Sequence, residues 1–381
     1  MQQGTVATNV TRGVSIVIPS WNGLELLKRF LPAIIEATTS YTRQFNAPAE
    51  VVIVDDGSVD ETVAWLLGQG FAEIGGSANA HEPAPRLTLI RNETNRGFGE
   101  TCNRGFEAAR YPLVFLLNND VEVDVNSIAP LVENFADDSV FGVHCRVFEL
   151  NSAQECGTGK LGSFARGFIR VHKSYVPRPV NDEEHEEHRA EGSRAPLYSM
   201  FAGGGSAMFD REKVIEIGGF EPLLSPFYWE DVELSYRAWK RGYTVLYEPR
   251  SVTHHRVSST VSKLDRRVVR RVEQRNRLIY HWIHLHEPSM MASHILWVLL
   301  LAMTAPLRLK PGFISSCIAA LRRLPEIRKR RLEERYAARR SDRDVFEIFA
   351  LMERRADVFI YDKYSELKIT QSGNRNKDGT L

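Results

Sequence analysis

Two sets of acidic residues stand where carboxylates can do chemistry. The apolar run Leu113–Leu117 leads directly into Asn118-Asn119-Asp120, and the aromatic run Phe227-Tyr228-Trp229 leads into Glu230-Asp231. A carboxylate at the C-terminal end of a strand lies at the crevice where open α/β sheets bind ligands. It can hold a divalent cation on a diphosphate, because hard cations prefer oxygen ligands, and a second acid can take a proton from an incoming hydroxyl. The two sets together predict group transfer from a nucleotide-activated donor.

Other polar residues follow strands earlier in the chain. Asp55-Asp56-Gly57-Ser58 can accept hydrogen bonds from a ribose or a base N–H, although Asp, Gly and Ser are also the usual residues of a structural turn. In Pro19-Ser20-Trp21-Asn22, the indole of Trp21 suits either stacking on a base or packing in the core. In Asn95-Arg96-Gly97-Phe98, Arg96 is suited to phosphate oxygens.

These residues are expected to be positioned by alternating strands and helices. β-branched and apolar runs predict strands at 14–18, 51–54, 87–90, 113–117 and 242–247, and helical spacing predicts helices at 24–35, from 62, and at 99–109. Structure is also expected at 200–209, followed by a helix with Asp210 as its N-cap. The alternation predicts an α/β fold with a parallel sheet and right-handed crossovers.

Size and composition are those of a folded protein with one large domain and an appendage. The chain has 381 residues and a formal net charge of +1, which gives no reason to expect a nucleic acid partner. Its four cysteines are widely separated and are expected to be reduced thiols in a cytosolic protein.

The pattern divides the chain into three parts. A catalytic domain is predicted for residues 1–262, with a nucleotide-binding half at about 13–125, an acceptor half at about 126–262 and an exposed charged excursion at 177–195. A basic helical extension is expected at 263–371 and a disordered tail at 372–381.

The extension alternates apolar helices with clusters of arginine. Its longest apolar run, 295–305, is shorter than the roughly 20 residues that a spanning helix needs. Basic residues beside apolar stretches suit a helix lying on an anionic membrane surface, and a solvated helical hairpin packed on the catalytic domain is the alternative.

Taken as a set, the strand-end motifs resemble those of the family 2 glycosyltransferases. The resemblance rests on residues 14–22, 54–58, 95–98, 117–120 and 227–234, and it covers about two thirds of the chain, from 14 to 259. It implies a GT-A fold, in which a Rossmann-like mixed sheet is flanked by helices. It also implies an inverting transfer from a nucleotide sugar with Mg²⁺ or Mn²⁺ as cofactor.

Carried over position by position, the resemblance assigns roles to these residues. It implies nucleotide binding by the following residues: Pro19, Trp21, Asn22, Asp55, Asp56, Arg96, Asn118 and Asn119. Asp120 would be a metal ligand and Asp231 the catalytic base, with Glu230 as its partner or substitute. Asn118 stands where the family's Asp-x-Asp motif has its first Asp. Relatives with this variant use deoxysugar donors, which points toward dTDP-rhamnose.

The later motifs are assigned in the same way. Gly203, Gly204 and Trp229 would shape the donor-sugar and acceptor site, and His254 would lie near the metal or diphosphate, with a buried structural histidine as the alternative. The run 274–278 echoes the Gln-x-x-Arg-Trp motif of processive synthases with Leu278 in place of the tryptophan, which favours transfer of a single sugar.

The expected protein is therefore a transferase on the cytosolic face of a bacterial membrane, acting on a glycan or lipid-linked acceptor in cell-surface polysaccharide synthesis. One rival is a sugar-1-phosphate nucleotidylyltransferase, which would need a glycine-rich basic loop where Pro19-Ser20-Trp21-Asn22 stands. The other is a non-catalytic scaffold that binds sugar nucleotides or glycans, which the presence of Asp120 and Asp231 disfavours.

Overall fold

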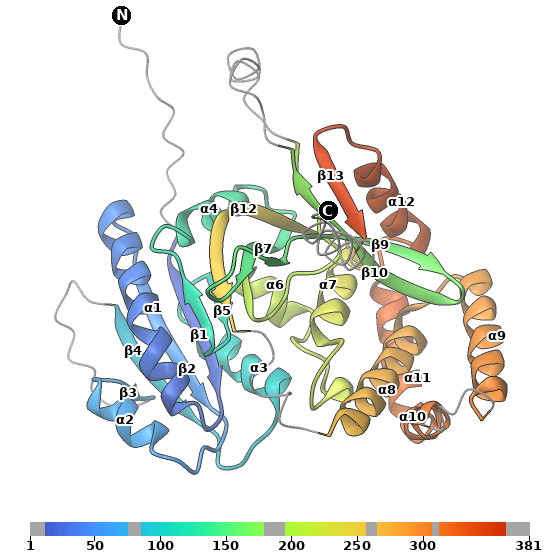
Figure 1. Cartoon of the computed structure of the whole chain (residues 1–381), viewed down its shortest axis with the longest axis horizontal. Coiled ribbons are helices and arrows are strands. Elements are labelled where there is room, and N and C mark those ends of the chain that lie inside the picture. The colour runs from blue at the N-terminus through green and yellow to red at the C-terminus, as the bar shows by residue number, and fades with distance from the viewer. Residues whose placement is uncertain (1–11, 75–84, 179–194, 257–264, 307–311, 363–381) are drawn as a thin grey trace, which may run out of the picture.

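The computed structural model describes residues 12–74, 85–178, 195–256, 265–306 and 312–362 (Figure 1). Nearly all of the predicted excursion at 177–195 and the whole tail at 372–381 lie outside these ranges. The strands are β1 Val14–Ser20, β2 Ala49–Asp55, β3 Ala72–Glu73, β4 Arg86–Arg91, β5 Leu113–Leu117, β6 Val121–Val123, β7 Val140–Glu149, β8 Glu155–Gly157, β9 Gly159–Ala165, β10 Phe168–Pro177, β11 Ser206–Asp210, β12 Thr244–His255 and β13 Val358–Asp362. The helices are α1 Leu24–Phe45, α2 Thr62–Gly68, α3 Phe98–Ala108, α4 Ile128–Glu133, α6 Arg211–Glu216, α7 Glu230–Lys240, α8 Arg266–His284, α9 Pro288–Thr304, α10 Gly312–Leu321, α11 Leu324–Ala337 and α12 Asp342–Glu353.

A large mixed sheet forms the centre of the predicted catalytic domain. Its strand order is β3-β4-β2-β1-β5-β11-β7-β12-β6. The strands β4, β2, β1 and β5 are parallel, and β11 is inserted antiparallel between β5 and β7. The mixed α/β fold expected from the sequence is confirmed.

Helices cover both faces of this sheet (Figure 1). The side chains of β1 alternate between the two faces: Ile16 and Ile18 pack in a core with Ile34 of α1, and Val17 packs in a second core with Phe106 of α3. Strands β1, β2 and β5 are buried throughout because both of their faces are covered.

Parallel pairing brings the ends of the central strands to one edge. Ser20 at the end of β1 is in register with Asp55 at the end of β2, and β5 runs parallel to β1 on its other side. The loops after these three strands therefore start from the same edge of the sheet, where open α/β sheets bind ligands.

The C-terminal extension packs on the catalytic domain and ends in a strand. Asp342 at the start of α12 accepts hydrogen bonds from the Tyr236 hydroxyl and the Lys240 ammonium of α7, both at 2.7 Å. After α12, β13 pairs antiparallel with β10 in a three-stranded sheet with β9. The sequence analysis expected helices to 371. The β-branched and aromatic run Val358–Asp362 instead forms a strand, because β10 offers it an edge. Among the helices described, none has both the length and the apolar content to cross a bilayer.

Candidate active site

Asp55 presents one unoccupied carboxylate oxygen at the end of β2. Its Oδ2 accepts a hydrogen bond from the Ser58 backbone N–H at 3.1 Å, while its Oδ1 is buried without a protein partner. A buried acceptor of this kind normally has a donor. Asp55 is therefore suited to receive a hydroxyl or N–H group of a ligand, as the sequence analysis expected for a nucleoside.

Asp56 has a different role. Its Oδ1 accepts from the Asn92 amide at 2.7 Å and from the Arg96 backbone N–H at 2.8 Å, and its Oδ2 accepts from the Gly97 backbone N–H at 3.0 Å. These bonds hold the loop between β4 and α3. Both oxygens of Asp56 thus bind the chain itself, and its predicted contact with the nucleoside stays a prediction.

Some of the residues at and after the end of β1 contact the rest of the protein, and others are exposed. Pro19 is buried within β1. The side chain of Asn22 accepts from the Val59 backbone N–H at 2.9 Å and so ties this loop to the one after β2. Trp21 is 48% exposed and Arg96 is exposed, so both can reach a ligand. Of these, Trp21 fits the base-stacking alternative and not the core alternative.

Asp120 lies beside a histidine at the far end of β12. Asp120 is 5% exposed, and its Oδ1 is 3.0 Å from His255 Nε2. The sequence analysis chose the neighbouring His254, whose ring stacks on Phe148 with centroids 5.6 Å apart. Both histidines are the last residues of β12 and do not follow it as expected. Successive side chains of a strand point to opposite faces, so only one of the two can face Asp120.

The Asp120–His255 pair fits a divalent cation bound together with a diphosphate. Carboxylate oxygen suits Mg²⁺ and Mn²⁺, and imidazole is a common metal ligand. Within the described ranges no three His, Cys, Asp or Glu side chains gather as a complete metal cage. Magnesium is typically held by one or two carboxylates with substrate phosphates and water, so a two-residue protein contribution is consistent with that type of site.

The two asparagines before Asp120 connect neighbouring loops. Asn119 donates from its side-chain amide to the Ser20 hydroxyl at 3.0 Å. The Asn118 backbone N–H donates to the Gly205 carbonyl at 3.0 Å. A Cβ on Gly205 would lie only 2.7 Å from the Asn118 amide nitrogen. A larger residue at Gly205 would therefore displace the Asn118 side chain, which begins the Asn-x-Asp motif.

Glu230 and Asp231 form the first turn of α7 and carry unsatisfied buried oxygens. Glu230 Oε2 and Asp231 Oδ1 are both buried without a hydrogen-bond partner, although the two residues are partly accessible. Burial raises the pKa of Asp231, against the effect of a backbone hydrogen bond from Gly204. Burial and then the charge of Asp231 raise the pKa of Glu230. Raised carboxyl pKa values are typical of general bases poised for work near neutral pH.

Gly203–Gly205 separates this acidic pair from the Asn-x-Asp motif. A Cβ on Gly204 would lie 2.6 Å from Asp231 Oδ1, and the next residue, Gly205, touches Asn118. Gly203 donates its backbone N–H to His144 Nδ1 at 3.3 Å. Gly204 thus lies against Asp231, and the adjacent Gly205 lies against Asn118.

The buried thiol of Cys102 on α3 is near the same carboxylates. Burial raises its pKa well above the usual value, and the negative charges of Asp231, Glu230 and Asp56 raise it further, in that order of size. The Cys102 thiol is therefore close enough to Asp231, Glu230 and Asp56 to feel the charge of each.

Trp229, which the sequence analysis assigned to the acceptor site, is partly buried against α8. Its ring packs on Tyr280 of α8, with centroids 5.4 Å apart, and the Arg277 guanidinium lies 5.5 Å from its centroid. Tyr228 is 38% exposed and is the aromatic side chain that this loop presents to solvent.

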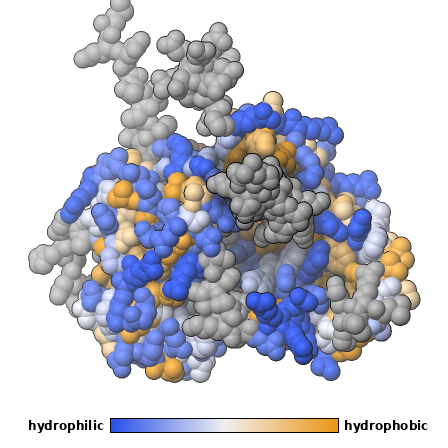
Figure 2. All heavy atoms as spheres, in the orientation of Figure 1, coloured by the Kyte–Doolittle hydropathy of each residue, from blue (hydrophilic) through white to orange (hydrophobic). Residues whose placement is uncertain are grey.

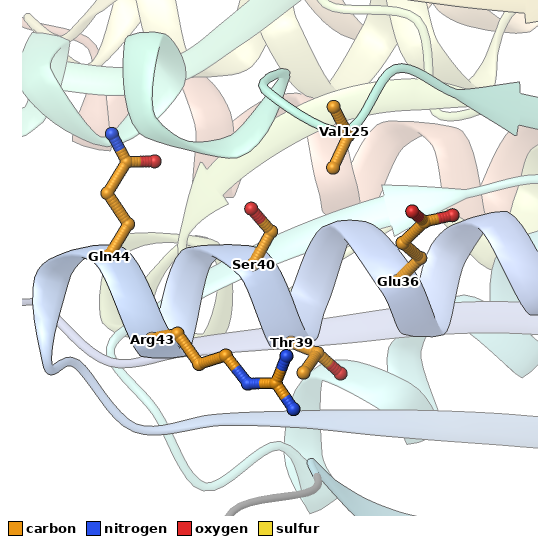
Figure 3. A pocket seen from close by; sticks show the side chains of 6 residues that line it. All are labelled: Glu36, Thr39, Ser40, Arg43, Gln44 and Val125. Carbon is orange, nitrogen blue, oxygen red and sulfur yellow. The ribbon is translucent and has the colours of Figure 1, made fainter.

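A surface pocket of about 540 Å³ lies apart from these residues, between α1 and Val125 in the loop after β6 (Figure 3). Its lining residues are Glu36, Thr39, Ser40, Arg43, Gln44 and Val125. It contains none of the predicted site residues.

Sequence reasoning missed three contributors. His255 was passed over for its neighbour, and Asn92 was not considered, although it follows β4 as the other polar residues follow their strands. Asn276 on α8 hydrogen-bonds the loop before Glu230. No short-range signal marks it, because that contact joins segments almost 50 residues apart.

The chain is similar in sequence and in fold to known glycosyltransferases. Residues 15–218 match the profile of glycosyl transferase family 2. The chain is 24% identical over 249 residues to N-acetylgalactosaminyltransferase 7 of Drosophila melanogaster, covering 63% of this chain and 39% of that protein. It is 31% identical over 120 residues to undecaprenyl-phosphate 4-deoxy-4-formamido-L-arabinose transferase of Serratia proteamaculans, about a third of each chain.

A solved structure of GalNAc-T7 with UDP, GalNAc and Mn²⁺ superposes with a TM-score of 0.52 at 23% identity. The match covers 73% of this chain and 49% of that one, so the chain spans less than half the length of these two N-acetylgalactosaminyltransferases. The similarity in structure shows a shared fold. Because the family profile spans more than half of the sequence, the chain belongs to glycosyl transferase family 2.

Proposed function

We propose that this protein transfers one sugar from a nucleotide-diphosphate sugar to a hydroxyl acceptor, with inversion at the anomeric carbon. The observation that supports the proposal is the pair of buried, unpartnered oxygens of Glu230 and Asp231. The Asp231 oxygen lies against Gly204, whose neighbour Gly205 lies against Asn118. Inversion is a single displacement, and one carboxylate at the acceptor hydroxyl is sufficient to take its proton.

In this mechanism the chain's residues bind, orient and move one proton. Asp55 Oδ1 accepts a hydrogen bond from the nucleoside, and Trp21 stacks on the base. Asp231 takes the acceptor proton as the new glycosidic bond forms and the nucleotide diphosphate leaves. Burial, and then the charge of Asp231, raise the pKa of Glu230, so Glu230 keeps its own proton more strongly. A Mg²⁺ or Mn²⁺ ion held by Asp120 and His255 would stabilise the charge of the leaving diphosphate.

The nucleotide site gives the direct test. A panel of UDP-, GDP- and dTDP-sugars with Mn²⁺ is expected to include a donor that raises the melting temperature, because ligands that bind the native state stabilise it. The first donor to test is dTDP-rhamnose, because Asn118 stands in place of the first Asp of the family's Asp-x-Asp motif. Asp55→Asn should lower the affinity for that donor by roughly tenfold or more, because a hydrogen bond to a charged group is lost. Asp56→Asn should instead lower the stability of the free protein by about 1–3 kcal/mol, because three loop N–H groups lose their carboxylate.

Isothermal titration and denaturant unfolding of both variants separate these effects. Equal donor affinity for the wild type and Asp55→Asn would contradict the assignment of Asp55. Donor binding without hydrolysis or transfer across an acceptor panel would favour the alternative of a non-catalytic sugar-nucleotide scaffold.

We further propose that the C-terminal extension places the enzyme on an anionic membrane on the cytosolic side, where a lipid-linked acceptor is presented. The apolar side chains at one edge of the molecule gather over α9 (Figure 2). The exposed ones are Ile295, Leu296, Leu299, Leu300 and Met303. This spacing forms one face of the helix.

Basic residues accompany this apolar face. Ile318 and Leu321 of α10 are also exposed, and Arg322 and Arg323 follow directly and are exposed. An apolar helix face flanked by arginines complements anionic headgroups above acyl chains. This charge complementarity favours a bilayer surface as the partner.

Vesicle flotation tests this placement. The wild type is expected to float with phosphatidylcholine vesicles that contain phosphatidylglycerol, and the double change Leu296→Gln with Met303→Gln should abolish flotation. The double change Arg322→Gln with Arg323→Gln should lower the affinity for these vesicles by roughly tenfold or more, because each basic residue contributes about 1 kcal/mol. Leu351→Gln, at an exposed position on α12, is the control. Equal flotation with neutral vesicles would contradict the role of the arginines.

A further inference from the structure

The loop that leads into the acidic pair has an unusual backbone. Tyr228 and Trp229 have φ angles of 71° and 76°, so two successive non-glycine residues are left-handed directly before Glu230. Each such residue costs energy and persists only where its surroundings over-determine it. The position of Glu230 and Asp231 therefore depends on whatever fixes this loop.

Asn276 of α8 binds the backbone of that loop. Its side-chain nitrogen is 2.9 Å from the Phe227 carbonyl oxygen and 3.0 Å from that of Tyr228, and it also donates to the Leu224 carbonyl. Asn276 is fully buried. Its oxygen accepts from Arg275 Nε at 2.9 Å, which turns the amide nitrogen toward the loop.

Three further residues of α8 hold the segment that follows. The Arg277 guanidinium lies over the rings of both Phe168 and Trp229, 4.4 and 5.5 Å from their centroids. The ring of Tyr280 packs on the indole of Trp229. One turn further, His284 Nε2 is 2.7 Å from Glu233 Oε1 in the first turn of α7.

Glu233 also forms an ion pair with Arg237 within the core. Burial acts to raise the pKa of Glu233, but Arg237 and His284 outweigh it and lower the pKa to about 2. Arg237 Nη2 is 2.8 Å from Glu233 Oε2. The first turn of α7 is thus held by Arg237, which is one turn further along the same helix, and by His284 of α8.

We propose that Asn276 and Arg277 are positioning residues for the Glu230–Asp231 pair, so that α8 is part of the catalytic unit and not an appendage to it. This inference rests on the proposed function, because it assigns the pair its role as base. Asn276 and Arg277 act through the loop 224–229, since their contacts are with its carbonyls and with the Trp229 ring.

The matched variants are Asn276→Asp and Gln274→Glu. Both exchange an amide for a carboxylate on α8, but Gln274 contacts the Ser316 hydroxyl of α10 at 3.5 Å. Asn276→Asp replaces the donor by an oxygen that repels the loop carbonyls. We expect its kcat to fall roughly 10- to 100-fold, the effect of a misplaced catalytic group, with the donor Kd within about threefold of wild type. Gln274→Glu should keep the wild-type kcat.

Arg277 provides a second pair if Asn276→Asp does not fold. Arg277→Lys retains a cation over Trp229 and should stay closer to the wild-type kcat than Arg277→Gln. A folded Asn276→Asp with wild-type kcat would overturn the inference, as would equal kcat in the two Arg277 variants, while leaving the transferase proposal intact.

Amide hydrogen exchange tests the inference without any activity. Exchange across 224–233 should be faster in Asn276→Asp than in the wild type and unchanged in Gln274→Glu, with exchange in β1 and β2 unaffected. Unchanged exchange across 224–233 would overturn the positioning role. A wild type that neither binds nor hydrolyses any donor would instead reject the transferase proposal.

Discussion

Asp231→Asn is expected to lower kcat by roughly 10²- to 10⁴-fold, the usual contribution of a positioned general base. The amide has the same shape as the carboxylate but cannot take the acceptor proton. Donor affinity should change little, because Asp55 and not Asp231 receives the nucleoside in the proposed mechanism. Initial rates of transfer and donor titrations measure the two quantities. A variant with full activity would remove Asp231 from its role.

The pH dependence of the same variant gives an independent check. Burial raises the pKa of Asp231 to about 7, so wild-type activity should fall as the pH drops through that range and not at the usual carboxyl value near 4. When a carboxyl has a higher pKa in the folded than in the unfolded state, the folded protein loses stability as the pH rises from the unfolded-state pKa to the folded-state pKa. Asp231→Asn should therefore melt higher than the wild type at pH 8 and not at pH 3. An identical difference at both pH values would contradict the burial of an ionisable group there.

Asp120→Asn is the second change with a large expected effect. Removing the carboxylate that would hold the cation should lower kcat by roughly 10³-fold, in line with the several kcal/mol that such charge stabilisation is worth. The Mn²⁺-dependent rise in melting temperature in the presence of UDP or dTDP should also be lost. Mn²⁺ titrations of rate and of melting temperature measure both.

The adjacent histidines supply a matched control for this assignment. His255→Ala should weaken Mn²⁺ binding, because its imidazole lies 3.0 Å from Asp120 Oδ1. His254→Ala should affect metal binding less, because that ring stacks on Phe148. Equal effects of the two substitutions would reject the choice of His255.

The positions of the central strands could be predicted from the sequence because their side chains are apolar on both faces. The runs at 51–54, 87–90 and 113–117 became β2, β4 and β5 with small shifts at their ends. The polar residues after them lie at one sheet edge because parallel strands end together. Asp210 also caps its helix as expected, accepting from the Lys213 backbone N–H at 3.1 Å.

Choices between neighbouring residues could not be predicted in the same way. Asp55 and Asp56 are chemically alike, and only the loop from Asn92 to Gly97 decides that Asp56 is used by the protein. The pairing of β12 with its neighbouring strands decides which of His254 and His255 faces Asp120, and a single sequence does not reveal that pairing. Asn276 and Arg277 reach the site only because α8 folds back on it.

The pairing of β13 with β10 has a consequence for how the molecule comes apart. The strand at 358–362 binds a hairpin formed some 180 residues earlier, and its neighbour α12 is anchored to α7 through Asp342. Loss of this segment would bare an edge strand and leave Lys240 without its buried counter-ion. Heating should accordingly give one concerted transition for both regions, and a protease cut near residue 340 should release no stable N-terminal fragment.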